Sequence, residues 1–185
     1  MRKTTVYLGV FFWLAGLSCL ASFPVILCGL QEGFKAQEPY FNLPVYSKTN
    51  SVVLRSDAHG KGYFGAPRDG RRTHQGIDIL TSLGDPVFAS KSGRVLFTGW
   101  GKGYGRYVEI RHPDGLRTRY AHLRQIYATQ GDWVKIQALI GACGKTGNAA
   151  NPAIKPHVHF EILASQGPIN PSSGLLDPSA TIRNS

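Results

Sequence analysis

The sequence predicts a mostly β domain, an antiparallel β-sheet or β-sandwich-like fold, preceded by one N-terminal hydrophobic helix. Three observations support this fold class. From Tyr63 onward, apolar and polar residues alternate in short runs. Glycines separate these runs, as they do where strands are joined by tight turns. No stretch of this part shows a sustained helical period with capping residues.

The hydrophobic helix is expected in residues 1–31. Two basic residues precede an apolar run from Val6 to Leu30, and no further charged residue occurs before Glu32. A run of this length spans a bilayer, and the basic start keeps the N-terminus in the cytoplasm. We therefore expect membrane anchoring, with the rest of the chain outside, in the periplasm or extracellular. The alternative is a signal peptide cleaved near Ala21, which would release a secreted domain.

Residues 32–62 are interpreted as a linker and lead-in. They mix prolines and polar residues with one strand-like run, Ser51–Leu54. The β domain then occupies residues 63–185. The sequence leaves open whether the lead-in or a regulatory partner covers the functional site.

The charge and the cysteines restrict the partners and the compartment. The formal net charge is +10, which favours anionic partners, although such a charge also serves solubility. An exported domain meets anionic lipid and cell-wall polymer, so we expect no nucleic acid partner. Cys143 is the single cysteine beyond the apolar segment, which rules out a disulfide framework there and predicts a small buried side chain.

The clearest hairpin is the stretch "YGRYVEIRHPDGLRTRYAHL". Val108 and Ile110 share one face of the first strand, and "HPDG" supplies the turn residues. Counting by twos along the return strand places Thr118, Tyr120 and His122 on one face. His122 is therefore expected at the end of a strand.

Further histidines differ in what surrounds them. His59 and His112 lie in turn-rich sequence and are interpreted as solvated loop residues. In "THQGIDI", His74 lies four residues before Asp78, with Gly76 between them. On a strand these three positions project to the same side, so two ligand groups would share a face.

The stretch "PHVHFEI" is a stronger signal. His157, His159 and Glu161 alternate with three apolar residues, so both imidazoles face away from the core. Two neighbouring imidazolium ions would repel each other, so the pair is expected to share a proton or a metal. The alternative is that both histidines simply lie on the wet face of an amphipathic strand.

Together these residues make the donor set of a hydrolytic zinc site. Catalytic zinc takes three protein ligands and keeps one position open. His74, Asp78 and one histidine of the pair would supply two nitrogens and one oxygen. The other histidine of the pair and His122 would then stand beside the reacting water as proton carriers.

The motifs "HQGID", "YAHL" and "HVH", in this order, resemble those of the lysostaphin-like or LytM-type zinc endopeptidases, which cut peptide bridges in bacterial peptidoglycan. The likeness covers about Gly62 to Ile169. It implies one zinc ion per chain, held by His74, Asp78 and His159. It also implies that His157 and His122 flank the attacking water, as base and as stabiliser of the developing oxyanion.

The chain departs from the family pattern in one loop. Residues 144–156 form a longer connection than usual, and Lys155 stands where the family has a glycine. We also find no match for the tyrosine that some relatives place near the transition state.

The resemblance thus implies a zinc metalloendopeptidase that hydrolyses peptidoglycan peptides in the cell envelope. The alternative is a non-catalytic LytM-type module that binds the cell wall or activates an amidase. The sequence does not specify which peptide bond is cut.

Overall fold

A computed structural model describes residues 28–68 and 72–184. The chain divides into two units, Met1–Gln37 and Glu38–Ser185. Within the first unit, residues 28–37 are helical. The expected membrane-spanning segment falls largely on residues 1–27, outside the described residues. Of the helices in the described part, none is long and apolar enough to cross a membrane.

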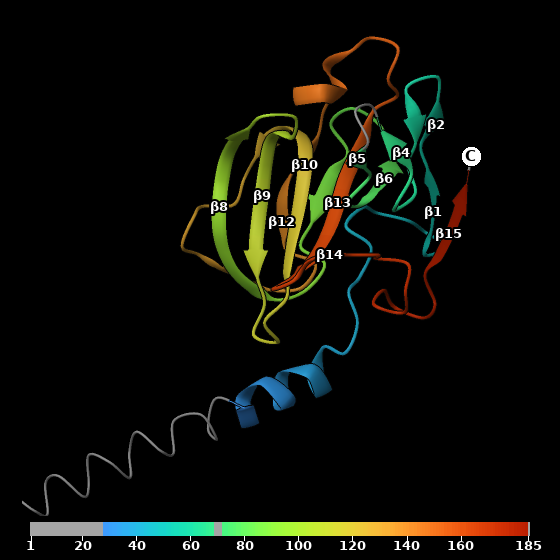
Figure 1. Ribbon diagram of the computed structural model, residues 1–185. Helices are drawn as coiled ribbons and strands as arrows, with labels where there is room; N and C mark the ends of the chain where they lie inside the picture. The colour runs from blue at the N-terminus through green and yellow to red at the C-terminus, as the bar shows by residue number, and fades with distance from the viewer. Residues whose placement is uncertain (1–27, 69–71, 185) are drawn as a thin grey trace, which may run out of the picture. The chain divides into compact units, whose positions relative to one another are not determined.

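The described part of the second unit is mostly β, with predominantly antiparallel pairing (Figure 1). Its only helical turn in the described ranges is the 3-10 turn η1 (Gly147–Ala150). The strands are β1 (Ser51–Leu54), β2 (Ser56–Asp57), β3 (Gly60–Lys61), β4 (Pro67–Arg68), β5 (Arg72–Thr73), β6 (Ile77–Leu80), β7 (Pro86–Phe88), β8 (Gly93–Gly101), β9 (Gly105–Arg111), β10 (Arg117–Ile126), β11 (Trp133–Val134), β12 (Leu139–Cys143), β13 (His157–Ala164), β14 (Gly167–Ile169) and β15 (Thr181–Asn184).

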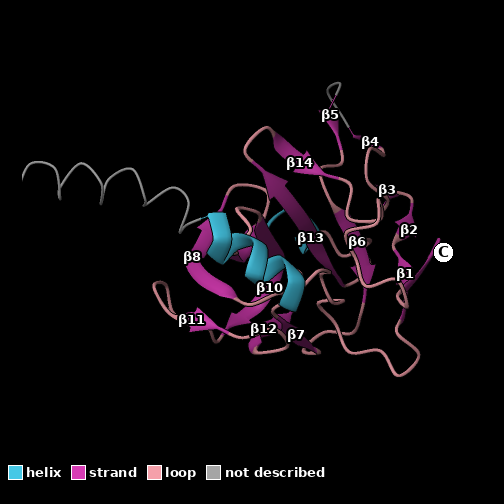
Figure 2. Cartoon of the chain, turned by 90° about the horizontal axis from the view of Figure 1, so that it is seen from below, coloured by secondary structure: helices cyan, strands magenta, loops and turns pink. Residues whose placement is uncertain are grey.

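One large sheet carries most of these strands, in the order β11-β8-β9-β10-β13-β6-β1-β15. Strands β1 and β15 pair in parallel, and the other neighbours on this path are antiparallel. The first half of β10 pairs with β13, whereas its second half pairs with β12, which in turn pairs with β7. In Figure 1, β12 accordingly lies behind β9 and β10, and Figure 2 shows β7 beside β12.

The predicted alternation of β13 is confirmed. Val158, Phe160 and Ile162 are fully buried and belong to one hydrophobic cluster with Ile77 and Ile79 of β6. Burying side chains of this size contributes about 1.5–3 kcal/mol each to stability. The opposite face of β13 carries His157, His159 and Glu161, whose polar side chains lie outside this hydrophobic cluster.

The lead-in segment takes part in this core. Phe41 and Leu43 are buried, and Val52 and Leu54 of β1 belong to the same hydrophobic cluster. Residues 38–62 therefore supply core side chains and one strand of the main sheet.

The hairpin of β9 and β10 forms as predicted, but the orientation expected for His122 is wrong. Thr118 and Tyr120 are buried, and the Tyr120 ring packs against Phe160 on the core side. The backbone of His122 has φ 63°, and the β9–β10 register shifts between Tyr120 and Leu123. Such an irregularity breaks the alternation and redirects a side chain. His122 therefore faces the other side, within a strand that continues to Ile126.

His112 is also not the solvated residue we expected. It is buried, with Nδ1 2.9 Å from Ser92 O and Nε2 2.9 Å from Thr118 Oγ1. The turn "HPDG" folds back so that the imidazole packs against Phe41. Cys143 is buried as predicted, and burial raises the pKa of its thiol to about 12.

Candidate metal centre

The site forms where β6 and β13 pair. Asp78 and His159 are direct register partners in this antiparallel pair, so their side chains meet on one face. His74 lies just before β6 and reaches the same place. A Cβ at Gly76 would collide with the carbonyl oxygen of Phe160, so the missing side chain allows this close approach.

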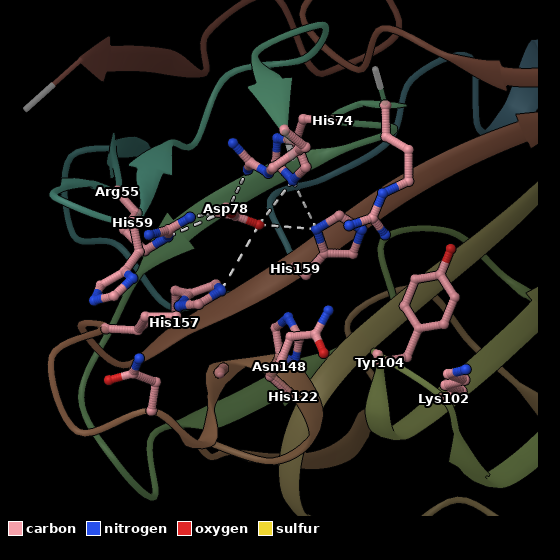
Figure 3. A pocket seen from close by; sticks show the side chains of 16 residues that line it. Arg55, His59, His74, Asp78, Lys102, Tyr104, His122, Asn148, His157 and His159 are labelled. Atoms are coloured by element: carbon pink, nitrogen blue, oxygen red, sulfur yellow. Dashed lines mark hydrogen bonds and ion pairs between the residues drawn. The ribbon is translucent and has the colours of Figure 1, made fainter. Parts of the chain in front are cut away.

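His74, Asp78 and His159 bring three ligand atoms together (Figure 3). His74 Nε2 lies 2.9 Å from Asp78 Oδ1, and His159 Nδ1 lies 2.8 Å from the same oxygen. The two imidazole nitrogens are 2.9 Å apart. All three side chains are buried.

Hydrogen bonds on the far side of each ring fix which nitrogen carries the proton. His74 Nδ1 lies 2.9 Å from Tyr63 O, an atom that can only accept. His159 Nε2 lies 2.9 Å from the Glu161 carboxylate, which is likewise an acceptor when ionised. In neutral rings, both nitrogens that face Asp78 therefore carry lone pairs.

Without a metal, the electrostatics favour a proton between these groups. Burial acts to raise the pKa of Asp78, but hydrogen bonds from His159 and His74 hold it well below its usual value. Burial acts to lower the pKa of His159, yet the carboxylates of Asp78 and Glu161 raise it to about 9. Three electron-pair donors around one point thus attract a positive charge, which a proton or a metal cation can provide.

The donor set fits zinc. Two imidazole nitrogens and one carboxylate oxygen are one of the ligand sets that catalytic zinc sites use, and each histidine is oriented from behind by a carbonyl or a carboxylate. The structure thus brings together the three residues that the family resemblance implies as zinc ligands.

His157 and His122 flank this centre. His157 Nε2 lies 3.8 Å from Asp78 Oδ1, and the rings of His122 and His157 are 4.9 Å apart. His157 Nδ1 lies 2.7 Å from Lys155 O, and His122 Nδ1 lies 2.8 Å from Thr146 O. These carbonyls hold the proton on Nδ1 and leave Nε2 of both rings as an acceptor.

Burial keeps both flanking rings neutral. It lowers the pKa of His157, and together with the neighbouring His157 and His159 it lowers the pKa of His122 to about 3. Both rings therefore present a bare Nε2, but a pKa of about 3 makes His122 a weak proton acceptor near neutral pH.

The centre opens into a cleft of about 490 Å³. Figure 3 shows Tyr104 and Lys102 on one side of the histidines and His59 on the other. Four cationic side chains line the cleft: Arg55, Arg68, Arg72 and Lys102. Asp78 is the one acidic side chain among its described lining residues.

Sequence reasoning missed three side chains around this centre. Glu161 holds His159, and the Tyr104 hydroxyl donates to Glu161 Oε1 at 2.9 Å, with burial raising the Tyr104 pKa to about 12. Arg55 binds Asp78. The alternation His-x-His-x-Glu could have identified Glu161. Tyr104 and Arg55 lie in sequence that carries no comparable pattern.

Comparison with known proteins identifies the family. The model of peptidase family M23 matches residues 72–171, more than half of the chain, so the chain belongs to this family. The predicted resemblance to lysostaphin-like and LytM-type peptidases is confirmed.

Two curated relatives illustrate the similarity. The DD-carboxypeptidase/endopeptidase Mpg of Neisseria meningitidis is 41% identical over 102 residues, 55% of this chain and 23% of the relative. The peptidoglycan DD-endopeptidase ShyB of Vibrio cholerae is 34% identical over 97 residues, 52% of this chain and 22% of the relative. The chain therefore spans less than a quarter of the length of these two relatives.

Solved structures share the fold. A zinc-containing peptidase from Vibrio cholerae superposes with a TM-score of 0.60 at 27% identity, covering 75% of this chain and 40% of that one. The catalytic domain of lysostaphin from Staphylococcus simulans gives a TM-score of 0.55 at 30% identity, covering 62% of this chain and 88% of that one.

Proposed function

We propose that this protein is a zinc-dependent endopeptidase that hydrolyses peptide bonds in bacterial peptidoglycan and remodels the cell wall. The observation that carries the proposal is the convergence of three lone-pair donors, from His74, Asp78 and His159, beside the two flanking neutral imidazoles. In this proposal these three residues hold one zinc ion per chain.

The chain's own residues would handle the protons. Zinc, when bound, supplies a Lewis acid and lowers the pKa of water to about 7. His157 Nε2 takes a proton from the attacking water. His122 presents a bare Nε2 as well, so it stabilises a developing oxyanion, or donates to the leaving nitrogen, only after it has gained a proton.

The cationic side chains that line the cleft favour the binding of an anionic substrate. Among the lining residues that the structure describes, the one acidic side chain, Asp78, already contacts Arg55 and Arg68. Lys102 adds a further exposed cation at the opening. Peptidoglycan peptides carry carboxylates, so opposite charges would attract them to this cleft.

The cell envelope is the compartment that fits this substrate. ShyB is named as a peptidoglycan enzyme, and the catalytic groups found here match that chemistry. Membrane anchoring through residues 1–31 stays a prediction, as does a regulatory partner.

The first experiment measures zinc and products together. The purified full chain should hold about one zinc per chain and release soluble fragments from defined muropeptides, identified by mass. His159→Ala should lose both zinc and hydrolysis. Hydrolysis by His159→Ala with no bound metal would contradict the proposal.

A second variant separates an enzyme from a non-catalytic wall-binding or amidase-activating module. His122→Ala should keep zinc but lose at least 100-fold in kcat, because general acid–base catalysis typically contributes about 10²–10⁴-fold. Binding of the wild type to cell-wall sacculi without product, despite bound zinc, would favour the module.

A further inference from the structure

We propose that Arg55 and Asp57 are positioning residues that lock Asp78 and His157 into one arrangement, and that the zinc affinity of the site depends on Arg55. This inference rests on the proposed function. Arg55 follows β1 in the lead-in, outside the residues 72–171 that match the family.

The two carboxylate oxygens of Asp78 have different partners. Oδ1 faces the imidazoles of His74 and His159. Oδ2 receives Nη2 of Arg55 at 3.0 Å and Nε at 3.2 Å, with Nη2 of Arg68 also at 3.2 Å. These three donors thereby hold Oδ2 in place and leave a single oxygen, Oδ1, for a metal.

The Arg55 guanidinium also binds a second carboxylate, that of Asp57. Its Nη1 donates to Asp57 Oδ1 at 2.6 Å, so one guanidinium bridges two carboxylates. The side chains of Arg55, Asp57 and Asp78 are only 4%, 8% and 4% exposed. Removing a cation from such a buried group leaves uncompensated negative charge, which is costly.

Asp57 is linked to His157 through the backbone of Lys155. Asp57 Oδ2 accepts the backbone N–H of Lys155 at 3.4 Å, a long hydrogen bond. The carbonyl of Lys155 in turn receives Nδ1 of His157 at 2.7 Å. Lys155 lies near the end of the loop 144–156 that departs from the family pattern, so the lead-in holds this longer loop beside the site.

Backbone bonds keep the assembly in place. The N–H of Arg55 donates to Asp78 O at 2.9 Å, and the N–H of Asp78 donates to Gly62 O at 2.8 Å. Arg55 thus contacts the metal-binding aspartate through both its backbone and its side chain, as the partners that orient metal ligands commonly do.

The test is the zinc affinity of full-length variants, measured by competition with a fluorescent chelator. Arg55→Met should weaken zinc binding about 10–100-fold, the usual effect of losing a partner that orients a ligand. Arg55→Lys keeps the charge but not the planar fork, and should show a smaller loss. This second variant serves if Arg55→Met does not fold.

The matched control is Lys91→Met. Lys91 and Asp114 form a salt bridge of 2.6 Å whose side chains are 2% and 4% exposed, and neither lines the cleft. This variant should lose thermal stability as Arg55→Met does, while its zinc affinity stays at the wild-type value.

Asp57→Asn tests the branch toward His157. It should keep zinc affinity close to wild type while kcat on muropeptides falls about 10-fold with KM unchanged. A kcat at the wild-type value would refute this branch.

The outcomes separate the two proposals. If the wild type binds zinc and Arg55→Met and Arg55→Lys bind it equally tightly, the inference on Arg55 is wrong while the proposed function stands. If the wild type binds no zinc, the proposed function fails, and the inference that rests on it fails as well.

Discussion

Gly76 lies just before β6 and packs against β13 beside the candidate metal centre. The space that a Cβ would occupy contains the carbonyl of Phe160, and the side chain of Glu161 lies 2.9 Å away. The position therefore has no room for a side chain unless the two segments move apart, and such a movement would displace His74 from His159.

We expect Gly76→Ala to destabilise the fold and weaken zinc binding together. Overpacking of a close contact typically costs about 1–3 kcal/mol. Thermal unfolding and chelator competition would measure the two effects. Gly33→Ala is the control, because no heavy atom lies within 4 Å of its Cβ position. Unchanged zinc affinity in Gly76→Ala would show that the site tolerates the displacement.

Single residues also show where sequence patterns fail. The strict alternation of His157 and His159 with apolar residues predicted their common face correctly, because β13 pairs with β6 and β10 without a register shift. The same counting failed for His122, because a left-handed φ is uncommon for a residue other than glycine and leaves no trace in the sequence.

At the level of elements, β13 supplies three groups of the site on one face. His159 is held between Asp78 and Glu161, and Glu161 Oε2 also receives Arg119 Nη1 at 2.8 Å. The Tyr104 hydroxyl completes the set of donors to this carboxylate. Glu161 therefore fixes the ring orientation and the tautomer of His159.

We expect Glu161→Gln to weaken zinc binding about 10–100-fold, since the carboxylate that supports a histidine ligand is lost. Chelator competition measures the effect. Glu109→Gln is the matched control, because Glu109 also binds Arg119 but makes no contact with a histidine. Equal affinities for Glu161→Gln and Glu109→Gln would contradict this role.

Long-range pairing explains why the sequence did not place β1 beside the site. The run Ser51–Leu54 reads as a strand, but it pairs with β6 through Leu54 and Ile79, and with β15 at residues 181–184. Local patterns cannot specify which distant strand completes a sheet. The role of the lead-in, and with it Arg55, therefore emerged only from the folded chain.

For the molecule as a whole, buried neutral histidines link stability to pH. Burial lowers the pKa values of His112, His122 and His157. The unfolded chain then binds more protons than the folded one as the pH falls below about 6.5, so stability decreases there. His159 has a raised pKa, so its contribution is already complete below pH 6.5 and does not offset this loss.

We expect the metal-free protein to lose stability between pH 6.5 and pH 5, with each such histidine contributing up to about 1.4 kcal/mol per pH unit. Urea unfolding with a chelator present would measure this slope. His112→Gln removes one buried imidazole far from the metal centre and should flatten the curve. An equal slope in this variant would exclude His112 as a contributor.

The pairing of Asp78 with His159 has a consequence for folding. These residues are 81 positions apart, and they meet only when β6 and β13 align in one register. A slip of one residue would turn one partner of the pair toward the core. A cation bound between them would stabilise the correct alignment alone, by mass action, and so would help the chain to distinguish its native sheet from near-native alternatives.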